Sequence, residues 1–118
     1  MATYVDGFVL PVPVGKMAEY KKMAKKAGKI WMEHGALAYQ ECVADDVPVG
    51  KVTSFPQAVK LKADEVVVFS WAVYKSRKHR DKVMKKVMSD PRLKLDAANN
   101  PFDGKRMFWG GFKTMVAM

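Results

Sequence analysis

The sequence has little cysteine or histidine and lacks the motifs that mark common metal and nucleotide sites. One cysteine, Cys42, and two histidines, His34 and His79, stand among 118 residues. Their spacing fits no metal-ligand pattern, and neither a phosphate-binding glycine loop nor a dinucleotide fingerprint occurs. We therefore expect no metal site and no bound cofactor.

Long apolar runs are also missing. No stretch approaches the ~20 residues that a membrane-spanning helix needs, and the N-terminal MATYVDGFVL lacks the basic segment of an export signal. A lone cysteine forms no internal disulfide, which suits a reducing compartment. The sequence predicts a soluble, cytoplasmic protein without a membrane partner.

The length and composition predict one domain over residues 1–118. A chain of this size that is 49% hydrophobic can bury a single core without disulfides or metals. No repeat, low-complexity tract or linker divides it.

Positive charge is concentrated in two segments of the chain, whose net charge is +9. Twelve basic residues lie in these segments: Lys16, Lys21, Lys22, Lys25, Lys26, Lys29, Arg77, Lys78, Arg80, Lys82, Lys85 and Lys86. Lysine is a good helix former, so solvated helix faces are the favoured interpretation. The alternative is a non-enzymatic module that binds RNA or an acidic protein. Such binding would depend on salt and ignore sequence, because no aromatic residues interleave with the lysines.

Hydrophobic periodicity predicts a ferredoxin-like α+β sandwich. The expected elements are strands over 3–12, 37–43, 65–74 and 106–116, a helix over 16–34, and a helix from Ser76 to Asp90. Ser54 is expected to cap a short helix over 56–60. The order strand, helix, strand, strand, helix, strand is typical of an antiparallel sheet with both long helices on one face.

The strand over 65–74, EVVVFSWAVY, is apolar on both faces. Val66, Val68 and Ala72 point one way, and Val67, Phe69, Trp71 and Val73 point the other. Two long helices can cover only one face of a small sheet. The second face is therefore predicted to pack against another copy of the chain, which makes the protein a homodimer.

Several long motifs together carry a resemblance to a known family. They are YVDGFVLPVP (4–13), HGALAYQECVADDV (34–47), GKVTSFPQAVKLK (50–62), VVFSWAVYKSRKHRD (67–81) and PFDGKRMFWGGF (101–112). With these motifs the chain resembles the YbaA-like family of small bacterial proteins, a domain of unknown function in the dimeric α+β barrel superfamily. The resemblance implies two ferredoxin-like units with their sheets face to face. Superfamily relatives include cofactor-independent monooxygenases of antibiotic biosynthesis, haem-degrading monooxygenases and isomerases.

Asp6 is the most suggestive polar residue, because it lies mid-strand among apolar neighbours. A buried carboxylate needs a cation or takes a raised pKa. Arg106 or Lys105 on the neighbouring last strand is the expected partner of a structural ion pair. In the functional alternative, Asp6 is a general base for a ligand lodged between sheet and helices.

Aromatic and polar residues predict an organic-ligand pocket near Asp6. The expected ligand-binding residues are Tyr39, Glu41, Trp71, Arg80, Arg106 and Trp109, with Asp6 and His79 as catalytic candidates. An ordinary core or dimer interface is the competing interpretation for the two tryptophans.

Three functions follow from these observations. The leading one is a homodimer that binds a small organic molecule and acts as a cofactor-independent monooxygenase or isomerase. The second is the basic module described above. The third is haem binding or degradation: the resemblance implies an asparagine on the first strand, a tryptophan on the third and a histidine on the next helix, where this chain has Asp6, Trp71 and His79.

Overall fold

The computed structural model describes residues 3–96 and 100–118 of the chain. Its elements are β1 (Tyr4–Pro13), a 3-10 turn (Val14–Lys16), α1 (Met17–Glu33), β2 (Ala38–Val43), α2 (Phe55–Ala58), β3 (Glu65–Tyr74), α3 (Arg77–Met88), α4 (Pro91–Asp96) and β4 (Phe108–Lys113). In the described part of the chain, no helix has the length and apolar composition needed to cross a membrane.

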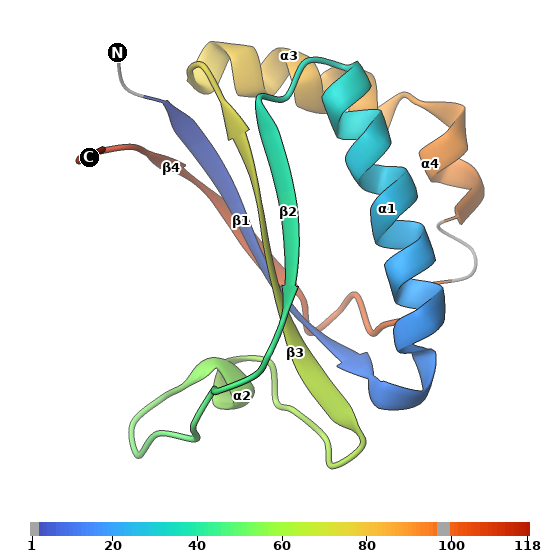
Figure 1. Cartoon of the computed structure of the whole chain (residues 1–118), viewed down its shortest axis with the longest axis vertical. Helices are drawn as coiled ribbons and strands as arrows, with labels where there is room; N and C mark the ends of the chain where they lie inside the picture. The colour runs from blue at the N-terminus through green and yellow to red at the C-terminus, as the bar shows by residue number, and fades with distance from the viewer. Residues whose placement is uncertain (1–2, 97–99) are drawn as a thin grey trace.

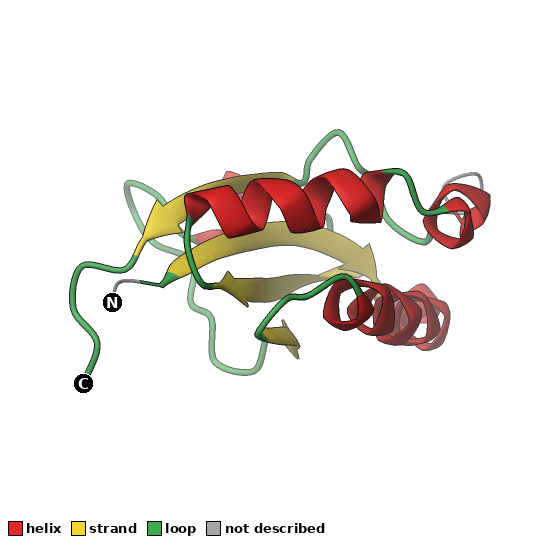
Figure 2. Ribbon diagram, turned by 90° about the horizontal axis from the view of Figure 1, so that it is seen from above, coloured by secondary structure: helices red, strands yellow, loops and turns green. Residues whose placement is uncertain are grey.

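The four strands form one antiparallel sheet in the order β2-β3-β1-β4. The first and last strands are neighbours, as the ferredoxin-like prediction required. In Figure 1, α1, α3 and α4 lie on the same side of the sheet, which we call the helix side. Figure 2 gives the view from above, where α1 and α4 again lie on one side of the strands. The predicted fold class is confirmed.

The strand register aligns four side chains into a row across the helix side. Glu41 on β2 pairs with Ser70 on β3, Ser70 pairs with Phe8 on β1, and Phe8 pairs with Trp109 on β4. We call Glu41, Ser70, Phe8 and Trp109 the floor row. It spans the whole sheet, and strand spacing of ~4.8 Å places β2 and β1 about 10 Å apart.

Two serines begin helices where the sequence predicted them. The Ser54 hydroxyl accepts a hydrogen bond from the Gln57 backbone N–H before α2, and Ser76 accepts one from His79 before α3. Each satisfies a backbone donor that the first helical turn leaves without a partner. Gly35 follows α1 with a φ of 112°, a conformation that favours glycine.

Two segments differ from the prediction. Pro91–Asp96 forms the extra helix α4, because the Asp90 carboxylate accepts the Arg92 backbone N–H and starts a new turn where the sequence predicted only a stop. The last strand covers Phe108–Lys113 and not residues 106–116. Its N-terminal end is shorter because Arg106 is engaged in ion pairs with Asp103 and Glu65.

The sheet is apolar on both sides but is covered differently. On the helix side, Tyr74, Ile30 and Val87 are almost completely buried. The other side, which we call the open face, carries α2 at one end, where Val59 packs on Val9 and Val67. Its remaining side chains include exposed Phe69, Phe108 and Phe112, the last 65% exposed. One side of the sheet is thus a closed core and the other an uncovered apolar surface.

Candidate functional site

A cavity of about 550 Å³ lies above the floor row, between the helix side of the sheet and the helices. Its walls are mainly apolar and include Leu10, Met23, Ala27, Met84, Phe102 and Met107. The volume falls within the ~300–1,000 Å³ of typical small-molecule sites. Charged side chains enter the cavity in two places, at Glu41 and at Arg80.

Glu41 forms the acidic end of the cavity. The Tyr20 hydroxyl donates to Glu41 Oε1 at 2.7 Å, and the Tyr39 hydroxyl donates to Oε2 at 2.5 Å. Burial and the neighbouring carboxylate raise the pKa of Tyr20 and of Tyr39 far above the ordinary phenol value. Both tyrosines therefore remain protonated donors, which hold Glu41 in a fixed orientation.

The Tyr39 ring reaches this position because α1 carries a glycine opposite it. A Cβ atom at Gly28 would lie 2.9 Å from the ring atom Cδ1 of Tyr39. That distance is shorter than van der Waals contact, so a larger residue at 28 would push the tyrosine away from Glu41.

Arg80 forms the basic end of the cavity. Its guanidinium lies over the rings of Tyr4 and Trp109, with its central carbon 5.1 Å and 6.0 Å from their centroids. Nη2 donates to the Tyr4 hydroxyl at 3.1 Å, and the side chain is only 14% exposed. Nε has no hydrogen-bond partner among the residues that the structure describes. The cavity thus contains a buried cation with unused donor capacity.

Asp6 lies beneath Arg80 and is fully buried. Its Oδ1 is 3.4 Å from Arg80 Nε, but within the described part of the chain neither carboxylate oxygen has a partner at hydrogen-bond geometry. Burial raises the pKa of Asp6, and the Tyr74 hydroxyl and the Arg80 guanidinium oppose that rise. The ion pair expected for Asp6 exists, but its cation comes from α3 and not from the last strand.

The predicted partner, Arg106, belongs to a different cluster. It binds Glu65 at 2.6 Å and Asp103 at 2.9 Å, and its Nη1 donates to the Lys60 carbonyl at 3.1 Å. These contacts tie the segment before β4 to the start of β3. Arg106 is therefore not among the residues that line the cavity, and its role in ligand binding stays a prediction.

Trp71 and His79 also lie away from the cavity. Trp71 alternates with Ser70 and Ala72 on β3, so it lies on the open face, where its ring is 5.4 Å from that of Phe69. The His79 Nδ1 accepts the Lys75 backbone N–H at 2.9 Å in the first turn of α3. The grouping of Asp6, Trp71 and His79 expected for haem is not formed.

Four of the predicted ligand-binding residues do line the cavity: Tyr39, Glu41, Arg80 and Trp109. Sequence analysis missed Tyr20, which binds Glu41, and Ser70, which lies in the floor row. Tyr20 lies on the buried face of α1, where a tyrosine is read as apolar and its hydroxyl is overlooked. Ser70 is the one polar residue between Glu65 and Tyr74 in this strand, and that signal was available.

One of the twelve basic residues in the two positively charged segments, Arg80, points toward the sheet. Eleven of their twelve lysines and arginines are exposed, whereas Arg80 lies over the sheet. The exposed eleven agree with solvated helix faces. Binding of RNA or an acidic protein by this surface stays a prediction.

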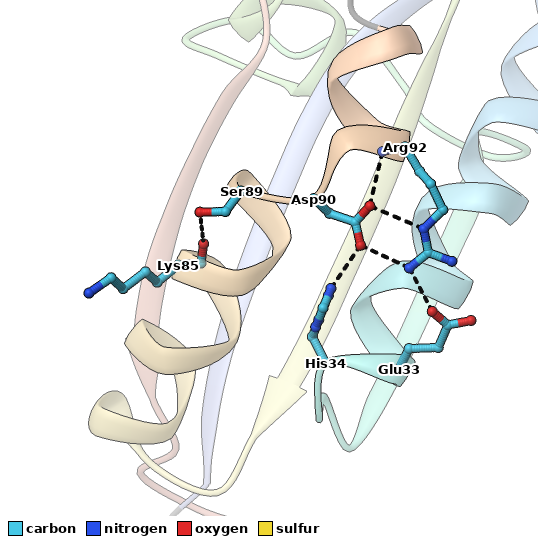
Figure 3. Close-up of polar contacts among 6 residues, drawn as sticks. All are labelled: Glu33, His34, Lys85, Ser89, Asp90 and Arg92. Carbon is cyan, nitrogen blue, oxygen red and sulfur yellow. Dashed lines mark hydrogen bonds and ion pairs between the residues drawn. The ribbon is translucent and has the colours of Figure 1, made fainter.

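A charged cluster joins the start of α4 to the C-terminal ends of α1 and α3 (Figure 3). The Asp90 carboxylate binds His34 Nε2 at 2.9 Å and Arg92 Nη2 at 2.8 Å, and Arg92 also binds Glu33 at 2.6 Å. The hydrogen bonds from Arg92 and His34 hold the pKa of Asp90 far below its ordinary value. Leu93 on α4 contributes to the cavity wall.

Comparison with known proteins gives a family for nearly the whole chain. Residues 3–104 match the family described as protein of unknown function, DUF1428. The uncharacterized protein YbaA of Escherichia coli strain K12 is 52% identical over 113 residues, which cover 96% of this chain and 97% of that protein.

Solved structures show the same fold at low sequence identity. A dimeric ferredoxin-like protein from an uncultured marine organism aligns with a TM-score of 0.57 and 10% identity, over 100% of this chain and 98% of its own. SnoaB, a cofactor-independent oxygenase from Streptomyces nogalater, aligns as its N63A mutant with a TM-score of 0.56 and 13% identity, over 99% and 95% of the two chains. At these identities the similarity establishes the fold alone.

Proposed function

The chain belongs to the DUF1428 family of proteins of unknown function, and from that premise we propose that it is a homodimer whose subunits each bind a small organic molecule between sheet and helices. The cavity above the floor row carries this proposal. It combines an apolar wall with two opposed polar ends, the arrangement typical of specific small-molecule sites.

The homodimer is supported by the open face. Phe69, Phe108 and Phe112 lie on one surface of the sheet and are 42%, 46% and 65% exposed. Several exposed aromatic residues on one face of a sheet are typical of protein interfaces. The ferredoxin-like neighbour described as dimeric provides a related fold that assembles.

For the bound molecule we propose oxygenation or isomerisation without a resident cofactor. Either reaction can begin with removal of a proton from carbon, and a carboxylate inside the cavity is suited to accept it. Glu41 lines the cavity, whereas Asp6 lies beneath Arg80, so Glu41 is the proposed base. The fold shared with a cofactor-independent oxygenase supports this reaction class.

Titration with the neutral fluorescent probe N-phenyl-1-naphthylamine tests binding in the cavity. Trp31 and Trp109 line the cavity and Trp71 lies on the open face. Energy transfer from tryptophan to the probe therefore follows binding, and the cavity-filling variant described next locates it. We expect saturable quenching that Trp109→Phe reduces and the matched variant Trp71→Phe leaves in place.

A cavity-filling variant provides the second arm. Ser70 is 3% exposed in the floor row, so Ser70→Phe would occupy the space above it and weaken probe binding by about tenfold or more. Val14→Phe adds the same side chain at a position 60% exposed and away from the cavity. Quenching that disappears with Trp71→Phe, or a Ser70→Phe variant that folds and binds normally, would refute the proposal.

A further inference from the structure

The basic end of the cavity identifies a chemical class for the ligand. We infer that the cavity selects a planar aromatic anion whose negatively charged oxygen group binds Arg80 and whose ring system lies along the floor row. This inference rests on the proposed binding function and specifies the charge of the molecule that is bound.

Arg80 is the first reason for this choice. A guanidinium has five N–H donors, and among residues 3–96 and 100–118 the only hydrogen bond that Arg80 makes is from Nη2 to the Tyr4 hydroxyl. The ion contacts with Asp6 and Asp81 are long, at 3.4 Å and 3.5 Å. A buried cation with unmet donors is costly, and a carboxylate, sulfonate or phenolate oxygen would satisfy them.

The groups around Arg80 prepare it for an anion. Tyr4 and Trp109 lie under the guanidinium plane, and Tyr4 fixes one of its nitrogens. Gly111 makes this packing possible, because a Cβ atom there would lie 2.5 Å from Arg80 Nη2 and would collide with the Tyr4 hydroxyl. The planar guanidinium of Arg80 is thus held in place before any ligand binds. This favours an oxyanion that accepts two parallel N–H hydrogen bonds from it.

The rest of the cavity determines the shape and polarity of the ligand. Phe8 and Trp109 stack at 6.3 Å between ring centroids and offer a flat surface for an aromatic body. Glu41 at the β2 end is negative and would repel a second anionic group. The distance of about 10 Å between β2 and β1 fits a body of two or three fused rings. The charge therefore lies at one end of the molecule.

A pair of fluorescent probes tests the charge directly. 8-Anilinonaphthalene-1-sulfonate and N-phenyl-1-naphthylamine share one ring skeleton and differ by the sulfonate. We expect the wild type to bind the anionic probe about tenfold or more tightly than the neutral one. Arg80→Gln should bring the ratio of the two affinities close to one.

Arg77→Gln is the matched control, because it removes one positive charge from the same helix at a side chain that is 68% exposed. It should leave both affinities unchanged. Arg80→Lys keeps the charge but loses the planar fork, so an intermediate preference is expected. If circular dichroism shows that Arg80→Gln does not fold, the comparison of Arg80→Lys with Arg77→Lys replaces it. The anionic preference should then fall in Arg80→Lys and stay unchanged in Arg77→Lys.

The outcomes separate the two proposals. Failure of both probes to bind the wild type in the cavity would overturn the binding function itself. Equal affinity for the two probes would leave that function standing and overturn the anion selectivity. An anionic preference that persists in folded Arg80→Gln, or falls equally in Arg77→Gln, would assign it to general surface charge and overturn the role of Arg80.

Discussion

Glu41 is the cavity carboxylate whose chemistry can be measured without knowing the natural ligand. The bicyclic ketone 2-tetralone carries acidic C–H groups, and proton magnetic resonance in deuterium oxide follows their exchange. We expect the wild type to accelerate this exchange above the buffer rate, and Glu41→Gln to lower the catalysed rate by about a hundredfold, because a general base contributes roughly 10²–10⁴-fold.

The matched control is Glu19→Gln on the exposed surface of α1, which should exchange like the wild type. Neutral-probe binding by Glu41→Gln must persist, since the amide retains an oxygen for Tyr20 or Tyr39. Unchanged exchange in a Glu41→Gln variant that still binds the probe would remove Glu41 as the base.

Single residues also show where sequence reasoning reaches its limit. The burial of Asp6 and its need for a cation follow from its apolar neighbours. The identity of that cation does not, because Arg80 comes from a helix 74 positions away in the numbering and reaches Asp6 across Gly111. Arg106 was the expected partner, but Glu65 and Asp103 are closer and engage it fully.

At the level of elements, the Asp90 cluster joins the ends of α1 and α3 to the start of α4. The pKa of Asp90 is held far below its ordinary value of 3.8, so the ionised carboxylate favours the folded state. That contribution is fully present above pH ~4 and is lost as the pH falls through the lower folded-state pKa. We expect Asp90→Asn to lower the thermal midpoint at pH 7 and to flatten its decline between pH 5 and 2.

Thermal unfolding followed by circular dichroism across this pH range provides the measurement. Asp45→Asn, in an exposed loop, is the control and should keep the wild-type pH profile. Residual acid sensitivity in Asp90→Asn is expected, because Arg106 also lowers the pKa of Glu65. A variant with the full wild-type slope would show that the cluster does not couple the three helices.

Elements were predictable where local rules act alone. Ser54 and Ser76 cap helices through hydrogen bonds within three residues, and Gly35 ends α1 through its own backbone conformation. Helix α4 was missed because Asp90-Pro91 reads as a terminator, while Asp90 also caps the next turn. The position of the cavity depends on the register between strands that are far apart in the sequence. The sequence therefore indicated some of its lining residues through their aromatic character but not its location.

For the whole molecule, the two sides of the sheet are predicted to have separate roles. The alternation along β3 placed Phe69, Trp71 and Val73 on a second apolar face, and the structure places exposed aromatic residues there. We propose that a second copy of the chain covers this face, because two long helices are enough for one side of the sheet only.

Phe112→Glu tests the dimer and its independence from the cavity together. Phe112 is 65% exposed on the open face, so a glutamate is tolerated in the folded subunit but would be buried without a partner in a homodimer. Light scattering after size exclusion should give twice the 13.3 kDa chain mass for the wild type and a single mass for the variant. Val14→Glu, at 60% exposure on the 3-10 turn, should remain dimeric.

The same variant then separates assembly from binding. The cavity lies wholly on the helix side, so monomeric Phe112→Glu should bind N-phenyl-1-naphthylamine with an affinity within about twofold of the wild type. A wild type that is monomeric at micromolar concentration would contradict the proposed dimer. A monomeric variant that folds but loses the probe would show that the cavity depends on the partner, because the sheet that forms its floor needs cover on its other side.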